Sequence, residues 1–165
     1  QAASVAKVTT IPEELKLPAT YFAALKLMDS KGELLADNFY WLSSKPDVMA
    51  FEKTRWVTTP IRSFADLTGL NNLPKLSIES SMETTQGADH QEFKVELRNP
   101  NLSIAFFIEL SLVDEETGQT FLPVFWSDNY VSLTGHETKE LTAKIPNCTI
   151  GNRKVALRIK GWNVN

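Results

Sequence analysis

The chain has 165 residues, of which 42% are hydrophobic and 22% are charged, and its formal net charge is −3. This is the composition of an ordinary globular protein, which excludes disorder caused by too few apolar residues. Lys and Arg are scattered, and no apolar run reaches the roughly 18 residues that span a bilayer, so we expect neither nucleic acid nor a membrane as a partner. The one cysteine, Cys148, excludes an internal disulfide and a cysteine-based metal site, and its role stays open.

The first 43 residues indicate part of a β-sheet. A candidate strand spans residues 4–10, and residues 21–28 and 34–42 flank the turn 29–32, whose Gly32 suits the left-handed position of a bulged hairpin turn. Two or three strands cannot bury two apolar faces by themselves. We therefore interpret residues 1–43 as the terminal strands of a preceding sheet. Their open edges predict that two copies of the fragment can pair as a dimer.

Residues 44–75 are a long connection with three prolines. Its three aromatic residues are Phe51, Trp56 and Phe64. A floppy linker would not carry such side chains, so we expect an ordered connector that packs on the following domain. Residues 63–70 predict a short helix with Ser63 as its N-cap.

Residues 76–165 carry the clearest pattern. Short runs of alternating apolar and polar residues are separated by turn signals. These runs are 76–78, 93–98, 104–113, 121–125, 130–133, 139–145 and 155–160. Six or seven short strands at this spacing predict an all-β domain of the β-sandwich type.

No set of catalytic side chains stands out. Asp114, Glu115 and Glu116 fall in a predicted turn, where solvated charges are a simpler interpretation than the carboxylate pair of a glycosidase. Both histidines, His90 and His136, fall in predicted loops, without a nucleophile motif or metal-ligand spacing. We expect no catalytic residue, no metal site and no cofactor in this chain.

One aromatic segment has two interpretations. Trp126, Asp128, Asn129 and Tyr130 combine ring faces that can stack on a sugar with groups that can bind its hydroxyls, which predicts a ligand site. The alternative is a corner of the sandwich, with Trp126 and Tyr130 packed inward and residues 128–129 at a bend. We favour the packed corner, because aromatic residues dominate the cores of small β domains.

Several stretches together resemble a known family. Residues 37–43 (DNFYWLS) are similar to the last strand of the immunoglobulin-like domain that follows the catalytic barrel in glycoside hydrolase family 2. The branch most similar is that of exo-β-D-glucosaminidases and β-mannosidases, including mannosylglycoprotein endo-β-mannosidases. Residues 58–60 with 63–71 resemble the connector into its final domain, and residues 122–133 and 159–163 resemble strands of that domain.

The resemblance implies the end of one immunoglobulin-like domain at residues 1–43, a packed connector at 44–75 and a complete immunoglobulin-like sandwich at 76–165. It implies a non-catalytic accessory part of a family 2 glycosidase, because no position matches the catalytic glutamates that the family carries on its barrel. Its partners would be that barrel and the preceding sandwich, with a wall of the sugar cleft as a further role, in a periplasmic or extracellular enzyme. The alternatives are an independent carbohydrate-binding module that uses Trp126–Tyr130 and, on fold analogy alone, a protein-interaction sandwich.

Overall fold

The computed structural model describes residues 4–11 and 15–165. Contacts divide the chain into two units, Gln1–Asn72 and Leu73–Asn165, which we describe separately. The predicted domain boundaries at residues 43 and 75 stay predictions. Both units are built from β-strands, which confirms the predicted all-β class.

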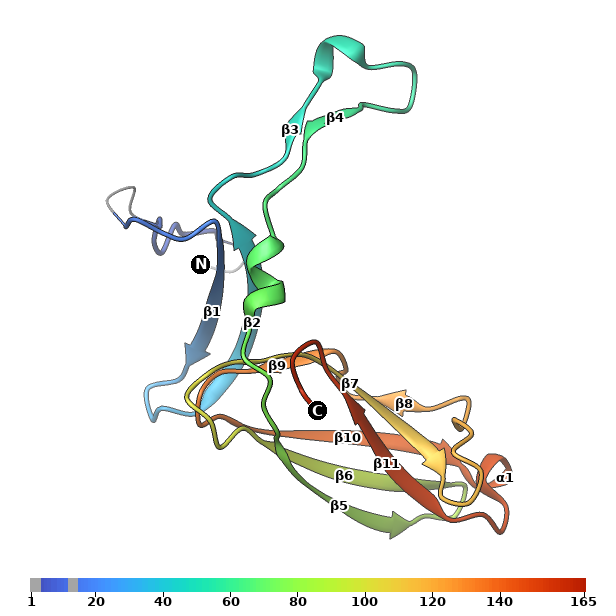
Figure 1. Cartoon of the computed structure of the whole chain (residues 1–165). Helices are drawn as coiled ribbons and strands as arrows, with labels where there is room; N and C mark the ends of the chain where they lie inside the picture. Colours follow the sequence, from blue (N-terminus) through green and yellow to red (C-terminus); the bar gives the residue numbers. More distant parts are fainter. Residues whose placement is uncertain (1–3, 12–14) are drawn as a thin grey trace. The chain divides into compact units, whose positions relative to one another are not determined.

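A β-hairpin forms the first part of the first unit (Figure 1). Strands β1 (Thr20–Met28) and β2 (Leu34–Ser43) pair antiparallel, as predicted. The Asp29 carboxylate accepts hydrogen bonds from the backbone N–H groups of Lys31 and Glu33, both at 2.8 Å, and Gly32 takes the predicted left-handed conformation with φ +85°. In the described range 4–11 no strand forms, contrary to prediction, and Val5 and Val8 there are exposed.

The rest of this unit is an arm followed by a short helix. In the arm, β3 (Val48–Met49) pairs with β4 (Ile61–Ser63), and the 3₁₀ helix η1 (Phe51–Lys53) lies between them. A second 3₁₀ helix, η2, spans Thr68–Asn72. A short helix was predicted over 63–70, and its predicted start at Ser63 is wrong. Ser63 ends β4, and the Asp66 carboxylate accepts from the hydroxyl (2.6 Å) and N–H (3.2 Å) of Thr68, so the helix starts five residues later.

The second unit is a sandwich of two antiparallel sheets (Figure 1). One sheet has the order β5 (Glu79–Gln86), β6 (His90–Arg98), β10 (Thr138–Pro146) and β8 (Phe125–Trp126). The other has the order β11 (Val155–Lys160), β7 (Ala105–Asp114) and β9 (Val131–Leu133). A four-residue helix, α1 (Asn147–Ile150), joins β10 to β11 and carries the exposed Cys148.

The core lies between these sheets because the alternating apolar residues of the long strands all face inward. Its fully buried members include Phe93, Leu97, Ile108, Leu110, Leu112, Leu133, Leu141 and Ile145. The outward side chains of β6 and β10 are polar, and they pair across these two strands: Lys94 with Glu140 at 2.8 Å and Lys144 with Glu92 at 3.3 Å. The hydrogen bond and charge of Glu140 raise the pKa of Lys94.

Three strand predictions need correction at their ends. The strand expected at 76–78 is β5, which starts at Glu79, while Leu76 forms only a bridge to Val164. The strand expected at 121–125 is reduced to β8, although Phe121 is buried and its N–H donates to the Leu112 carbonyl at 3.0 Å. His90 opens β6 opposite Pro146, so it does not lie in a loop.

Candidate functional site

The segment 126–130 begins inside the sandwich. Trp126 lies in β8 opposite Ala143 of β10, and its ring packs against the buried residues of both core clusters. The next residue, Ser127, continues this pairing, because its N–H donates to the Thr142 carbonyl at 2.8 Å and its hydroxyl accepts from the Thr142 N–H at 2.9 Å. Trp126 is therefore a partly buried residue that packs against the core.

The two polar residues of the segment are occupied by the protein itself. Asn129 Oδ1 accepts from the Leu110 N–H at 2.8 Å, and its Nδ2 donates to the Leu110 carbonyl at 2.9 Å. Asp128 accepts from the Asn129 N–H at 2.8 Å and lies 3.5 Å from Lys139 Nζ. Asn129 thus fixes the chain to β7, as a residue of a bend does.

Tyr130 lies apart from Trp126. Its backbone is left-handed, with φ +55°, and its ring is half-exposed, with its centroid 5.2 Å from that of Phe107. The structure therefore directs Trp126 to the core, Asn129 to β7 and Tyr130 to the outer surface of the three-stranded sheet. Ligand binding by these four residues stays a prediction.

A shallow groove of about 250 Å³ lies beside Tyr130 on that outer surface. It is lined by residues of β7, β11 and the two loops next to them. These residues are Phe107, Glu109, Tyr130, Lys160, Gly161 and Trp162. No sequence pattern predicts this grouping. Phe107 and Tyr130 are 23 positions apart, Tyr130 and Trp162 are 32 positions apart, and a tryptophan such as Trp162 is equally typical of a core.

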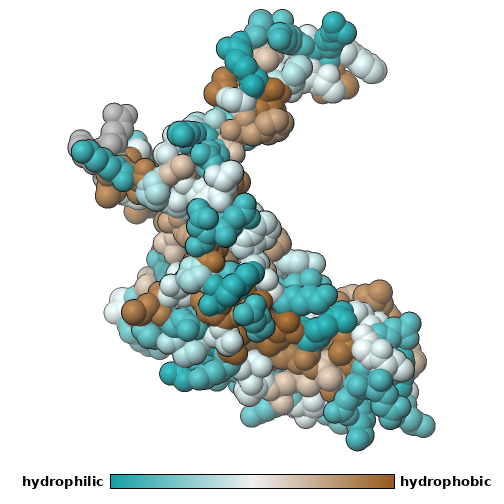
Figure 2. All heavy atoms as spheres, viewed as in Figure 1, coloured by the Kyte–Doolittle hydropathy of each residue, from teal (hydrophilic) through white to brown (hydrophobic). Residues whose placement is uncertain are grey.

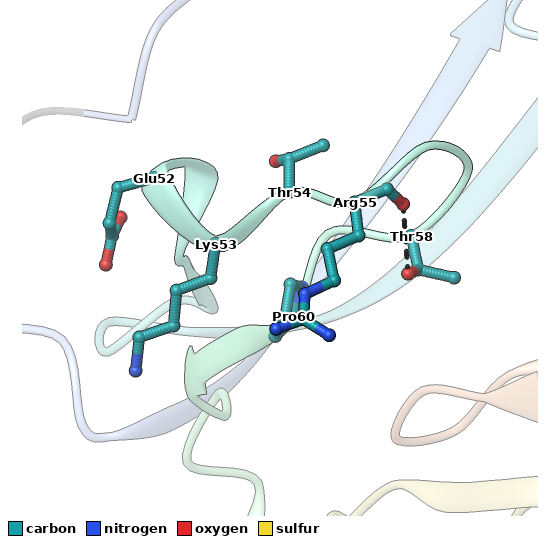
Figure 3. A pocket seen from close by; sticks show the side chains of 6 residues that line it. All are labelled: Glu52, Lys53, Thr54, Arg55, Thr58 and Pro60. Carbon is teal, nitrogen blue, oxygen red and sulfur yellow. Dashed lines mark hydrogen bonds between the residues drawn. The ribbon is translucent and has the colours of Figure 1, made fainter.

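A second hollow lies on the arm of the first unit. It encloses about 620 Å³ and is lined by side chains of one loop: Glu52, Lys53, Thr54, Arg55, Thr58 and Pro60 (Figure 3). The Thr58 N–H donates to the Arg55 carbonyl at 2.8 Å, which closes the tight turn at residues 56–57. Its charged groups include the Glu52 carboxylate, which binds Arg62 at 2.5 Å.

Asp114 has a structural role in the turn that follows β7. Asp114 was expected to be solvated but is buried, and its carboxylate accepts from the N–H groups of Glu116 and Thr117, which builds the predicted turn. Among residues 4–11 and 15–165 no group of three or more His, Cys, Asp or Glu side chains is placed to hold a metal ion. Within the same ranges no helix has the length and apolar character needed to cross a membrane.

Comparison with known proteins gives consistent matches. Residues 56–164 match the family described as "Exo-beta-D-glucosaminidase Ig-fold domain". The chain is 38% identical over 161 residues to the exo-beta-D-glucosaminidase of Amycolatopsis orientalis and 36% identical over 158 residues to that of Streptomyces avermitilis. These matches cover 96% and 93% of this chain but only 16% and 17% of the relatives.

Solved structures agree. The crystal structure of the A. orientalis exo-chitosanase CsxA matches with a TM-score of 0.90 and 37% identity, covering 97% of this chain and 19% of that one. A complex of CsxA with PNP-beta-D-glucosamine gives the same values. The resemblance noted in the sequence is therefore confirmed, and of the branches it named the glucosaminidase branch is the one matched. The chain belongs to the family of exo-β-D-glucosaminidase immunoglobulin-fold domains.

Proposed function

We propose that this chain is a non-catalytic accessory part of a larger family 2 glycosidase of the exo-β-D-glucosaminidase type, which it stabilises and whose sugar cleft it helps to wall. One observation carries the proposal: nearly the whole chain matches glucosaminidases, yet it spans only 16% of the length of the first relative. The acid/base groups of the parent enzyme would then lie in the remainder of its polypeptide. The family resemblance further leads us to propose a periplasmic or extracellular location.

The exposed apolar residues of the hairpin support a larger parent. Within the described residues β1 and β2 pair only with each other. The ribbon nevertheless carries large apolar side chains on both faces, with Leu25 and Leu27 on one and Leu35 and Trp41 on the other, all exposed. A two-stranded ribbon with solvent-exposed apolar side chains on both faces is only marginally stable. Further strands of the preceding sheet in the parent would bury both faces, and without them copies of the fragment would pair edge to edge.

The arm supports the same conclusion. Trp56 at its tip is 98% exposed with a left-handed φ of +42°, and its neighbour Val57 and the nearby Phe51 are exposed as well. Figure 2 shows apolar residues among polar ones on the surface of the arm formed by β3 and β4. The arm pairs only through strands of two and three residues, and Ala50 is the only buried residue within 48–63, so these side chains have no core to pack into. We propose that its tip contacts another part of the parent enzyme.

The test compares the parent enzyme with variants in this chain. Deletion of residues 73–165 should lower the melting temperature and the yield of soluble enzyme, and Trp56→Ser should lower kcat/KM or the melting temperature of the parent. In the isolated chain, Trp56→Ser should change the free energy of unfolding by less than about 0.5 kcal/mol, because the side chain is already in water. Lys53→Ser on the same arm is the control. A deletion variant with unchanged turnover and melting temperature would refute the proposal.

A further inference from the structure

The outer face of the three-stranded sheet carries a row of aromatic rings. The centroids of Trp162 and Phe106 lie 6.5 Å apart, those of Phe106 and Phe107 5.7 Å, and those of Phe107 and Tyr130 5.2 Å. Phe106 is buried beneath the row, whereas Phe107, Tyr130 and Trp162 are 36%, 52% and 47% exposed and line the groove. The exposed members thus present ring surface to solvent from three separate parts of the chain.

The backbone that holds two of these rings is unusual. Phe107 and Tyr130 both have left-handed backbones, with φ +53° and +55°, a conformation that bulky side chains avoid at a cost of about 1–3 kcal/mol each. Phe107 lies in a β-bulge: Ala105 pairs with Leu133 and Ile108 with Val131, so Phe106 and Phe107 together lie opposite Ser132. The bulge is held by the Ser132 hydroxyl, which accepts from the Phe107 N–H at 3.1 Å. Bulges of this kind re-aim side chains next to binding sites.

The groove also has a polar side. Glu109 of β7 and Lys160 of β11 are directly opposite in the sheet register, and both line the groove. They supply one acidic acceptor and one cationic donor beside the rings. An apolar floor with a few convergent polar groups is the composition of a small-ligand site, and about 250 Å³ suits one sugar ring rather than a drug-sized molecule.

We infer that this groove binds one end of a β-linked glucosamine oligosaccharide. The ring C–H surfaces would lie on Tyr130 and Trp162, the Glu109 carboxylate would accept from the protonated amino group, and Lys160 would donate to a hydroxyl. The net charge of −3 favours the approach of such a polycation. The choice of glucosamine rests on the proposed function, whereas the groove itself rests on its geometry.

The four tryptophans allow a direct test on the whole 165-residue chain. Each gives its own indole N–H signal in a ¹H–¹⁵N spectrum, so a titration with the hexasaccharide of glucosamine to millimolar concentration reports which one meets the sugar. The Trp162 signal should move and saturate, while those of Trp41, Trp56 and Trp126 stay in place. An unmoved Trp162 signal, or a shift confined to Trp126, would overturn the inference.

Variants separate the parts of the site. Tyr130→Ala should weaken binding about tenfold through lost stacking, and Glu109→Gln should weaken binding of the glucosamine hexamer but not of a neutral cellulose hexamer. Thr142→Ser, outside the groove, should bind as the unchanged chain does. Tyr130→Ala that folds and binds with full affinity would overturn the inference. If the parent proves inactive on glucosamine while Trp162 still responds to the hexasaccharide, the proposed function fails and the groove stands.

Discussion

Substitution of Asn163 should destabilise the sandwich strongly, although this residue lies two residues from the end of the sequence. Its side chain is 1% exposed. Its Oδ1 accepts from the Phe106 N–H at 2.8 Å, and its Nδ2 donates to the Ile104 carbonyl at 2.8 Å and to the Pro74 carbonyl at 2.9 Å. One amide therefore ties the first residues of the unit to the start of β7.

Replacing this amide by a methyl group removes all three hydrogen bonds. At about 1 kcal/mol for each bond, with an added penalty for the buried Phe106 N–H left unpaired, Asn163→Ala should cost about 3–4 kcal/mol. That is a large share of the 5–15 kcal/mol that is typical of a folded domain. Urea unfolding followed by far-UV circular dichroism should show a midpoint lower by about 2 M at an unchanged slope of about 1.5–2 kcal/mol/M.

The matched control is Asn152→Ala. Asn152 is exposed in the turn after α1, so its loss should move the urea midpoint by no more than about 0.3 M. If Asn163→Ala lowers the midpoint by less than about 0.5 M, the three bonds do not hold the sandwich together and the reasoning is refuted. A changed slope would instead mean that the variant altered the compactness of one of the two states.

Gly135→Ala should destabilise the sandwich more than Gly118→Ala, as thermal melts can show. A Cβ at position 135 would lie 2.4 Å from the Leu102 carbonyl oxygen. A Cβ at position 118 would meet nothing within 4 Å, so Gly118→Ala costs only about 1 kcal/mol for the left-handed φ of +70°. Equal losses of melting temperature in the two variants would contradict the clash at position 135. Thr68→Ala should raise the pKa of Asp66 towards 3.8, because the Thr68 hydroxyl and N–H lower it. Because the pKa of Asp66 is lower in the folded state than in the unfolded state, its carboxylate stabilises the fold above pH ~3.8, and this stabilisation is lost as the pH falls through the folded pKa. If the titration of the Asp66 carboxyl group is the same in the variant, Thr68 is not what lowers its pKa.

The strands that sequence predicts well are those with one buried face. In β6 from Phe93 onward and in β10 from Leu141 to Ile145, every second residue is apolar and buried, so alternation located 93–98 and 139–145. Strand β5 was missed over most of its length, because it is an edge strand that is polar on both faces and packs only Met82 against the core. Its pairing with β6 comes from backbone hydrogen bonds, which leave no pattern in the side chains.

The candidate site shows a different limit of sequence reasoning. Trp126 and Tyr130 are four residues apart but face different surroundings, because β8 ends at Trp126 and Tyr130 itself has a left-handed backbone. Phe107, Tyr130 and Trp162 are far apart in sequence, and only the register of β7 with β9, shifted by one bulged residue, brings the first two rings together. Neither the bulge nor its left-handed Phe107 has a composition signal, since no glycine marks it.

Asparagine side chains explain why turn-forming residues can act as parts of a sheet. Val131 pairs with Ile108, so the next pair in the ladder would join Asn129 to Leu110, and the Asn129 side chain makes both bonds that its backbone would otherwise make. A carboxamide can do so because it presents one acceptor and two donors, as a peptide group presents one of each. Asn99 is used in the same way: the two N–H bonds of its Nδ2 are shared among the carbonyls of Ser103, Leu133 and Thr134, at 2.8, 3.2 and 3.0 Å. Where the pairing of β7 with β9 stops, the Asn129 amide pairs with the N–H and carbonyl of Leu110. The sheet therefore ends without leaving these two backbone groups unpaired, and the chain can turn Tyr130 outward.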